Sequence, residues 1–260
     1  MSTPASLGPE AGSRPTRAPA ATPAADGAGA GLRGRVLDAL ATVYDPELDE
    51  PITSLRFVTS CQVTPEGDVD VVLRLPTPQC APNFAFLMAA DASRAVRRLP
   101  GVRAVDVRLD DHYTGDEINA ALARGEGFGG AFPGETDDDE LHALRELFTR
   151  KALIARQSKV CEEVVARGGS AEALLSGSVA DLPDTPAARR CLELRQLLGI
   201  DAAPDAPALV LASGERLTAD QLQRWLRMAR LVRTSLDANG GICRSLLQVR
   251  HGLAPDPQEV

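Results

Sequence analysis

Two apolar periodicities divide this sequence of 260 residues. Between residues 52 and 109, apolar and polar residues alternate in three segments, which is typical of half-buried β-strands. The segments are 52–63, where a loop leads into the strand, 69–75 and 104–109. Apolar residues at helical spacing precede them in 32–43 and separate the last two in 82–99. This order of helix, hairpin, helix and strand predicts an α+β fold, a small two-layer α/β sandwich with its helices on one face of the sheet.

From residue 137 onward the apolar residues follow helical spacing only. Helices are expected at 137–166, 171–175, 186–198, 218–236 and 242–249. One short apolar run, 207–211, is the candidate for an isolated strand in this half. The pattern therefore predicts that the sandwich is followed by an all-α C-terminal domain.

Composition sets the remaining boundaries. Residues 1–31 are almost entirely Ala, Pro, Gly, Ser and Thr, so they bury too little apolar surface to offset the entropy of ordering, and we expect a disordered tail. The α+β domain then covers 32–122, a glycine-rich linker 123–136, the helical domain 137–252 and a short tail 253–260. The linker lacks the pattern of a phosphate-binding loop, so it is interpreted as a hinge between domains.

Charge and hydropathy exclude several classes of function. The formal net charge of −8 argues against general nucleic-acid binding. No segment approaches the roughly 18 consecutive apolar residues that span a bilayer, and the N-terminus lacks signal-peptide features, so we expect a cytoplasmic protein without a membrane partner. Arg224, Arg227, Arg230 and Arg233 form a basic stripe, which is suited to solvent or to an acidic partner protein.

The five cysteines are an odd number without a CxxC pair, which favours reduced thiols over disulfides or a zinc ribbon. Among the five cysteines, Cys80 is the candidate for a reactive or metal-binding thiol, because it falls just before the first turn of the helix expected at 82–99. The helix dipole and free backbone N–H groups there favour a thiolate, the form of cysteine that binds soft metals or attacks electrophiles. The alternative is a small, partly buried cysteine that only packs.

The residues around Cys80 resemble a known family. In order, the sequence contains Asp45-Pro46-Glu47, a strand pair, Thr77-Pro78-Gln79-Cys80, and Leu99-Pro100-Gly101-Val102 before the last strand. This arrangement over residues 33–109 resembles the small domain shared by SufT, PaaD and the cytosolic iron–sulfur targeting factors of eukaryotes. The resemblance implies a non-enzymatic factor that assembles iron–sulfur clusters or delivers them from a scaffold donor to client apoproteins.

The resemblance also implies roles for individual residues. Cys80 is the main cluster ligand, Asp45 and Glu47 support it, and Thr77 and Pro78 are structural members of the motif. The family often has glycine before the cysteine and proline directly after it, whereas this sequence has glutamine and alanine. It also lacks the cysteine-rich zinc segment of PaaD. Residues 112–119 and 132–135 are similar to a longer variant of the family with a helical extension, which is associated with operons for binuclear-iron monooxygenases.

A single thiolate per chain cannot hold an iron–sulfur cluster, which takes about four sulfur ligands. Two arrangements supply the rest: a homodimer that brings two copies of Cys80 together, or a transient cluster that bridges to the donor or the client. Asp45 and Glu47 would then provide a hard ligand or accept the thiol proton. The alternative for this acidic segment is a turn with solvated carboxylates.

Other candidate metal ligands each have a plainer alternative. His112 follows the last strand beside two acids, where a solvated loop histidine is the simpler interpretation. Cys61 lies in the first strand, where packing is the simpler role. Cys161, Cys191 and Cys243 each fall on the apolar side of a helical pattern. Together they offer a second cluster site, although free cysteines commonly pack in cores.

Two further functions stay open from the sequence. A chaperone dedicated to a binuclear-iron monooxygenase would bind an oxygenase component through the helical half without carrying a cluster. A cysteine-dependent enzyme is less favoured, because none of His112, His142 and His251 has a motif context that would activate the thiol.

Overall fold

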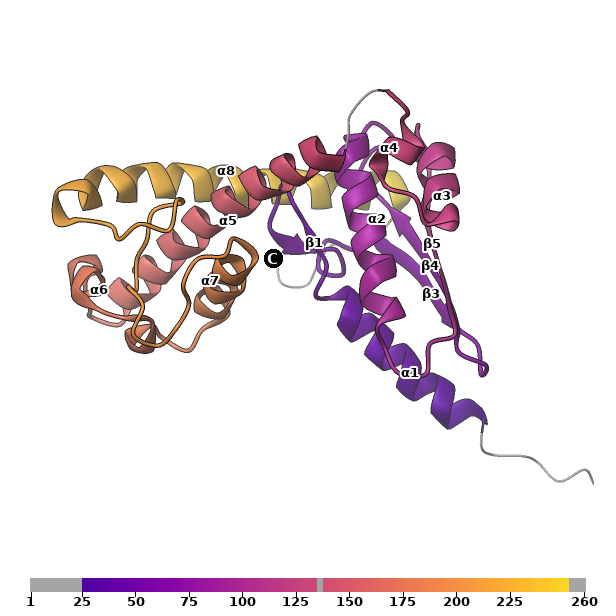
Figure 1. Cartoon of the computed structure of the whole chain (residues 1–260), viewed down its shortest axis with the longest axis horizontal. Coiled ribbons are helices and arrows are strands. Elements are labelled where there is room, and N and C mark those ends of the chain that lie inside the picture. The colour runs from indigo at the N-terminus through magenta and orange to yellow at the C-terminus, as the bar shows by residue number, and fades with distance from the viewer. Residues whose placement is uncertain (1–24, 135–137, 253–260) are drawn as a thin grey trace, which may run out of the picture.

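The computed structural model describes residues 25–134 and 138–252, and they form the predicted α+β fold (Figure 1). The first half contains α1 (Ala25–Leu40), β1 (Tyr44–Asp45), β2 (Glu50–Pro51), β3 (Val58–Val63), β4 (Asp68–Arg74), α2 (Pro82–Arg97), β5 (Ala104–Asp110), α3 (Gly115–Arg124) and α4 (Phe128–Ala131). One sheet has the order β3-β4-β5, with β3 antiparallel and β5 parallel to β4. β1 and β2 make a separate antiparallel pair. Helices α1 and α2 pack against each other and against the three-stranded sheet.

The alternation along β4 decides which side of the sheet meets the helices. Val69, Val71 and Leu73 are buried, while the residues between them are half exposed. Because β4 is the central strand, these three side chains lie in the middle of the first core, together with apolar residues of α1 and α2. The predicted sandwich is thus built as the sequence pattern indicates.

Two turns touch at the end of this sheet. Gly67, in the β3–β4 turn, has a φ of 90°, and its carbonyl accepts a hydrogen bond from the Arg103 N–H (2.8 Å). A Cβ atom on Gly67 would lie 2.2 Å from the carbonyl oxygen of Gly101 in the α2–β5 turn. Glycine is therefore required at this position both by its left-handed backbone and by the close approach of another backbone segment.

We expect Gly67→Ala to lower the free energy of unfolding by roughly 2 kcal/mol, since it adds a backbone clash to a strained φ. Gly125→Ala is the matched control, because Gly125 also has a positive φ of 72° but a Cβ atom on it would have nothing within 4 Å. Urea denaturation of both variants measures the difference. Equal losses in the two variants would show that the contact with Gly101 contributes nothing.

The second half is helical, as predicted. Its elements are α5 (Asp138–Ala166), α6 (Ala171–Ser176), a short 3-10 helix (Val179–Asp181), α7 (Pro186–Leu197) and α8 (Ala219–His251). The run 207–211 forms isolated β-bridges instead of the strand considered from the sequence. The buried amide of Gln157 pairs with it, since Nε2 donates to the Val210 carbonyl (3.0 Å) and Oε1 accepts from the Val210 N–H (2.9 Å). Among the described helices, none has an apolar stretch long enough to cross a membrane.

A single helix, α8, replaces the two helices expected at 218–236 and 242–249. It begins in the core of the helical half, where Trp225 is buried, and ends on the core of the α+β half, where Leu247 is buried. Figure 1 shows α8 running along both halves of the molecule, beside α5. Glycine weakens a helix by about 1 kcal/mol relative to alanine. The glycine pair 240–241 nevertheless does not end α8, because tertiary packing holds the helix on both sides of it.

Helix α1 forms where the sequence predicts a helix but starts earlier than expected, and α4 is a helix that the sequence does not predict. α1 begins at Ala25, inside the predicted tail 1–31, and residues 1–24 and the tail 253–260 lie outside the described part of the chain. α4 lies inside the predicted linker 123–136, and it forms because Phe128 and Phe132 bury their rings in the first core, 4.8 Å apart between centroids. The division into domains stays a prediction, but residues 128–132 are packed and not an open loop.

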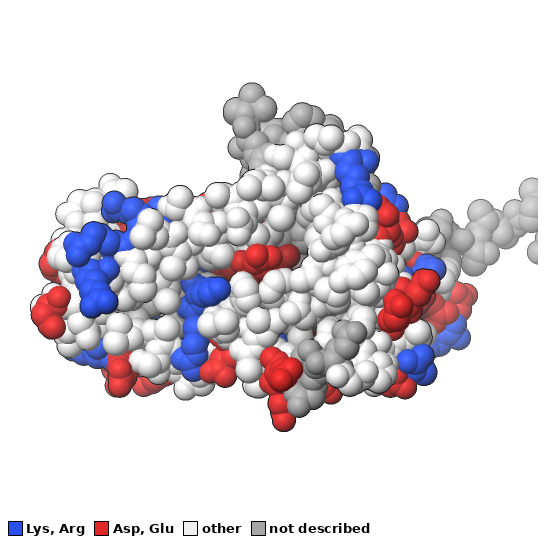
Figure 2. All heavy atoms as spheres, turned by 90° about the horizontal axis from the view of Figure 1, so that it is seen from above, with Lys and Arg blue, Asp and Glu red and all other residues white. Residues whose placement is uncertain are grey.

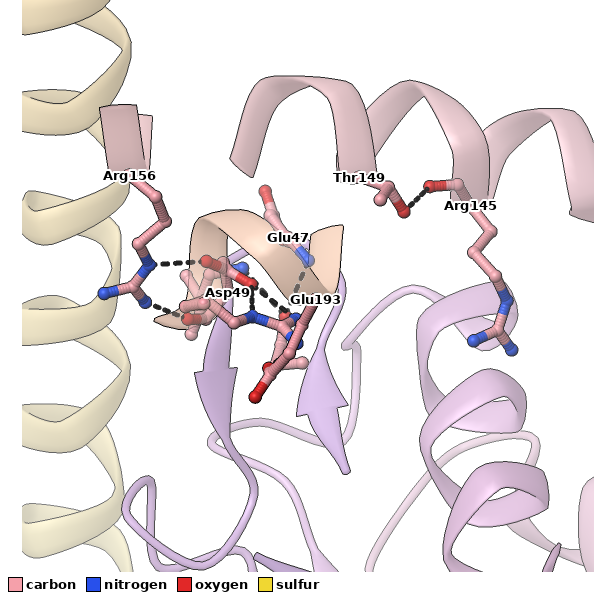
Figure 3. A network of polar contacts seen from close by, with 9 residues as sticks. Glu47, Asp49, Arg145, Thr149, Arg156 and Glu193 are labelled. Carbon is pink, nitrogen blue, oxygen red and sulfur yellow. Dashed lines mark hydrogen bonds and ion pairs between the residues drawn. The ribbon is translucent and has the colours of Figure 1, made fainter. Parts of the chain in front are cut away.

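Asp49 joins the two halves through a buried carboxylate (Figure 3). It lies between β1 and β2, with a φ of 51°. Its Oδ2 accepts a hydrogen bond from Nε of Arg156 on α5 (2.6 Å), and its Oδ1 accepts from Nη2 of Arg190 on α7 (2.8 Å). The Arg190 guanidinium also stacks over the Tyr44 ring, 3.4 Å from its centroid. One carboxylate thus holds two helices of the second half against the β1–β2 pair of the first.

Candidate functional site

The Asp-Pro-Glu segment forms a tight turn between β1 and β2. Asp45 ends β1, and its Oδ1 accepts hydrogen bonds from the backbone N–H groups of Glu47 (2.8 Å) and Leu48 (3.0 Å). Burial raises the pKa of the Asp45 carboxyl to about 6, although these two hydrogen bonds lower it. Asp45 is therefore a buried acid that builds the turn, and not the solvated carboxylate of the alternative interpretation. Glu47 is only partly buried.

Cys80 lies in the loop between β4 and α2, one residue before the helix N-cap, Ala81. Its backbone N–H donates to the Thr77 carbonyl (3.3 Å), and Thr77 Oγ1 lies 3.6 Å from its Sγ. The Pro78 carbonyl accepts a hydrogen bond from the Tyr113 N–H (3.1 Å), which ties the loop to the segment after β5. Thr77 and Pro78 thus fix the backbone around Cys80, whose side chain is partly exposed.

His112 supports the same loop from the other side. Its Nε2 donates to the carbonyl oxygen of Cys80 (2.8 Å), and its Nδ1 accepts from the Thr114 N–H (3.3 Å). Both ring nitrogens are therefore engaged by the protein's own backbone. The geometry makes His112 a residue that positions Cys80, and it leaves neither ring nitrogen for a metal or for the thiol.

Three of the five cysteines are buried. Cys61 faces the first core from β3, and burial raises the pKa of its thiol. Cys161 on α5 and Cys191 on α7 lie in the second core, where burial raises the pKa of each thiol to about 12. In all three the pKa is shifted upward by burial, as expected for thiols that pack.

Cys243 does not join the two cysteines of the second core, so the structure separates the three thiols that the sequence grouped into a second cluster site. It lies near the end of α8 and packs, partly buried, against the first core, as Cys80 also does. The pKa of the Cys243 thiol is raised to about 11, chiefly by burial and then by the nearby Asp45, Cys80 and Glu47, while Arg244 lowers it. Ionisable residues of both sequence motifs therefore act electrostatically on a thiol from the C-terminal helix. No local sequence signal identifies this neighbour, because the position of Cys243 depends on α8 being continuous.

The described residues contain no group of three or more His, Cys, Asp or Glu side chains arranged to hold a metal ion. The motif residues therefore do not form a complete metal site within one chain.

The arginine stripe expected on α8 is exposed over its first three members, and its last member is paired within the protein. Arg224, Arg227 and Arg230 are exposed, whereas Arg233 pairs with Glu162 of α5 (2.7 Å). Each step of three residues turns about 300° around a helix, so the four side chains point in progressively different directions. On the face shown in Figure 2, charged side chains form small groups spread over the surface, and several basic and acidic groups adjoin one another.

Comparison with known proteins decides the family. A family model described as iron–sulfur cluster assembly protein matches residues 33–107. An uncharacterised protein of Methanocaldococcus jannaschii is 36% identical over 87 residues, which are 34% of this chain and 90% of that protein. The chain belongs to the iron–sulfur cluster assembly protein family. Its assignment to a SufT-like or PaaD-like branch stays a prediction.

Proteins named iron–sulfur cluster carrier protein are also similar. The one from Mycobacterium leprae is 37% identical over 81 residues, which are 31% of this chain and 21% of that protein. The one from Mycobacterium tuberculosis H37Rv is 38% identical over 79 residues, which are 30% of this chain and 20% of that protein. The chain thus spans about a fifth of the length of these curated relatives. No solved structure matches it.

The family domain contains both motifs but ends before the helical half. The match runs from α1 into β5, so it includes Asp45, Glu47 and Cys80. His112, α3 to α7 and the whole of α8 lie outside it. Cys243 therefore belongs to an extension of the family domain.

Proposed function

We propose that this protein assembles iron–sulfur clusters or delivers them to client apoproteins, and that the Cys80 thiolate contacts the cluster. The observation that carries the proposal is the exposure of Cys80 within the family domain. The other cysteine of that domain, Cys61, is buried, whereas Cys80 is partly exposed in a loop whose backbone is fixed on two sides. A ligand that must receive and release a cluster has to be accessible to a partner and held in one place.

The cluster is cargo in this function, and the donor and the client are its partners. Sulfur is the ligand that iron–sulfur clusters take from proteins, usually as four thiolates. Cys80 provides one of them, so the remaining ligands must come from elsewhere. A cluster bound this way is transient or bridging, as cluster transfer requires.

We expect the wild-type chain to take up a cluster during anaerobic incubation with ferrous iron and sulfide, read by visible absorption, and Cys80→Ala to take up none. Cys61→Ala is the matched control, because it removes a buried thiol of the same domain. Transfer is measured by mixing the loaded protein with a plant-type apo-ferredoxin and following the recovery of the ferredoxin spectrum. Uptake by Cys80→Ala at the wild-type level, or no uptake by the wild type, would contradict the proposal.

A chaperone for a binuclear-iron monooxygenase is the second candidate, and one observation favours it. α8 exposes large apolar side chains, among them Leu231 (73% exposed) and Val249 (87% exposed), which suit contact with another protein. In this function Cys80→Ala would mature the oxygenase component as well as the wild type does. The same variant therefore separates the two functions.

A further inference from the structure

The C-terminal part of α8 crosses the segment that carries the Asp-Pro-Glu motif. Arg244 of α8 pairs with Glu50 of β2 (2.6 Å), directly after the turn that Asp45 builds. The two elements are close here, since a Cβ atom on Gly240 would lie 2.7 Å from Glu50 Oε1. The helix is thus anchored beside the first motif by both charge and close approach.

A second anchor lies beside the loop of Cys80. Arg250 of α8 pairs with Asp111 (2.9 Å), which directly precedes His112 in the chain. His112 in turn donates to the Cys80 carbonyl, so this ion pair ties α8 to the segment that positions the Cys80 loop. Between the two anchors, Leu247 is 1% exposed and fixes the rotation of the helix against the first core.

Cys243 lies next to Arg244 on this anchored part of α8, partly exposed and packed on the same core as Cys80. The ionisable groups that act on its thiol include those of Asp45, Cys80 and Glu47. Cys243 and Cys80 are also the two free cysteines of the chain that are not buried. The extension therefore brings a second accessible thiol to the motif residues of the family domain.

We propose that Cys80 and Cys243 form a two-thiolate site that binds one edge of an iron–sulfur cluster and leaves the other edge open to ligands of the client or donor. The identity of the cargo rests on the function proposed above, whereas the pairing of the thiols rests on the geometry of α8. A site with two of the usual four thiolates is half complete.

The chemistry of the pair favours a soft metal centre. Each thiol loses its proton to the solvent as its sulfur binds the metal, so two protons are released when both ligate. Protons and the metal therefore compete for both sulfurs. Thiolates on one edge also leave the opposite edge free for exchange with a partner's thiolates.

Cadmium ions test the pairing without iron or sulfide, because cadmium–thiolate bonds absorb in the ultraviolet and the absorption counts the thiolates bound. We expect the reduced, full-length wild-type protein to bind one cadmium ion through two thiolates. Cys80→Ser and Cys243→Ser should each lose about half of the absorption and bind cadmium more weakly, and the double variant should lose nearly all of it. Cys191→Ser, which removes a fully packed thiol, should leave the absorption unchanged. Circular dichroism checks that each variant is folded.

The outcomes separate this inference from the proposed function. A folded Cys243→Ser protein with the wild-type cadmium absorption would overturn the two-thiolate site, even if iron and sulfide still load a cluster onto Cys80. Loss of cadmium binding in both single variants supports the site, and it does so even if the wild type takes up no iron–sulfur cluster. In that case the thiol pair stands and the proposed cargo is wrong.

Discussion

Asp49→Asn is expected to lower the free energy of unfolding by about 3 kcal/mol, because it removes the buried charge that compensates two arginines. Asparagine matches aspartate in shape and tolerates the left-handed φ of 51°, so the substitution changes the charge and little else. Arg190 keeps its contact with Glu193 (3.0 Å), whereas Arg156 loses its carboxylate partner. The side chain of Arg156 is 30% exposed, so water can solvate its charge once the carboxylate is gone. The expected decrease in the free energy of unfolding therefore lies at the lower end of the range for a broken buried ion pair.

Asp184→Asn is the control for this prediction. Asp184 also pairs with an arginine, Arg189 of α7, but its side chain is 89% exposed. Exposed ion pairs contribute little, so we expect a change within about 0.5 kcal/mol. Guanidinium unfolding followed by circular dichroism measures both variants. A loss for Asp49→Asn no larger than that for Asp184→Asn would mean that the carboxylate does not hold the two halves together.

Asp45→Asn is expected to raise the free energy of unfolding by up to about 3 kcal/mol at pH 7. Burial raises the pKa of this carboxyl from 3.8 to about 6, so the folded protein binds its proton more tightly than the unfolded chain does. Each tenfold difference in proton binding corresponds to about 1.4 kcal/mol. The contribution of Asp45 to stability is therefore fully present below pH 4 and is lost as the pH rises through 6. Asparagine keeps the acceptor for Glu47 and Leu48 without the charge.

The measurement is the free energy of unfolding of the wild type and of Asp45→Asn at pH 4 and at pH 7. The gain should be near zero at pH 4, where the wild-type carboxyl is protonated when folded, and large at pH 7. If Asp45→Asn raised the free energy of unfolding equally at pH 4 and at pH 7, the ionisation of Asp45 would not be the cause. Cluster uptake by Asp45→Asn then tests whether the negative charge of Asp45, which destabilises the fold at pH 7, is needed for binding a cluster at Cys80 and Cys243.

The sandwich could be predicted from the sequence because its strands are long enough to show their period. Val69, Val71 and Leu73 alternate with polar or half-exposed neighbours, and the pattern alone identifies the face that packs. The β1–β2 pair could not be predicted, because its strands have two residues each and a two-residue strand has no period. The sequence shows only a turn at that place, and the turn is where Asp45 and Glu47 lie.

The candidate site could be predicted only where its residues are close in the sequence or belong to a motif. Thr77 and Cys80 are three positions apart and contact each other directly. Asp49 could not be singled out, because its partners Arg156 and Arg190 lie 107 and 141 residues further along the chain. From the sequence alone, Asp49 is expected to be solvated, because the helices that bury it, α5 and α7, come much later in the chain.

The position of Cys243 could not be predicted for a different reason. A glycine pair is a reasonable place to end a helix, and a helix ending there would leave Cys243 on a separate segment of the helical half. The pair stays helical because Arg244 and Leu247, shortly after it, bind the α+β half. Tertiary contacts therefore override the local preference of glycine, and they change which core the cysteine joins.

The continuity of α8 also makes its length a fixed quantity. From Trp225 in one core to Leu247 in the other the helix makes about six turns over roughly 33 Å, so both side chains leave it in nearly the same direction. One residue inserted or deleted between them would rotate the end of the helix by about 100° relative to its beginning. Leu247 and Cys243 would then face away from the family domain while the helical half kept its own core. The number of residues in α8 between Trp225 and Leu247 therefore determines how the helical half is oriented against the family domain.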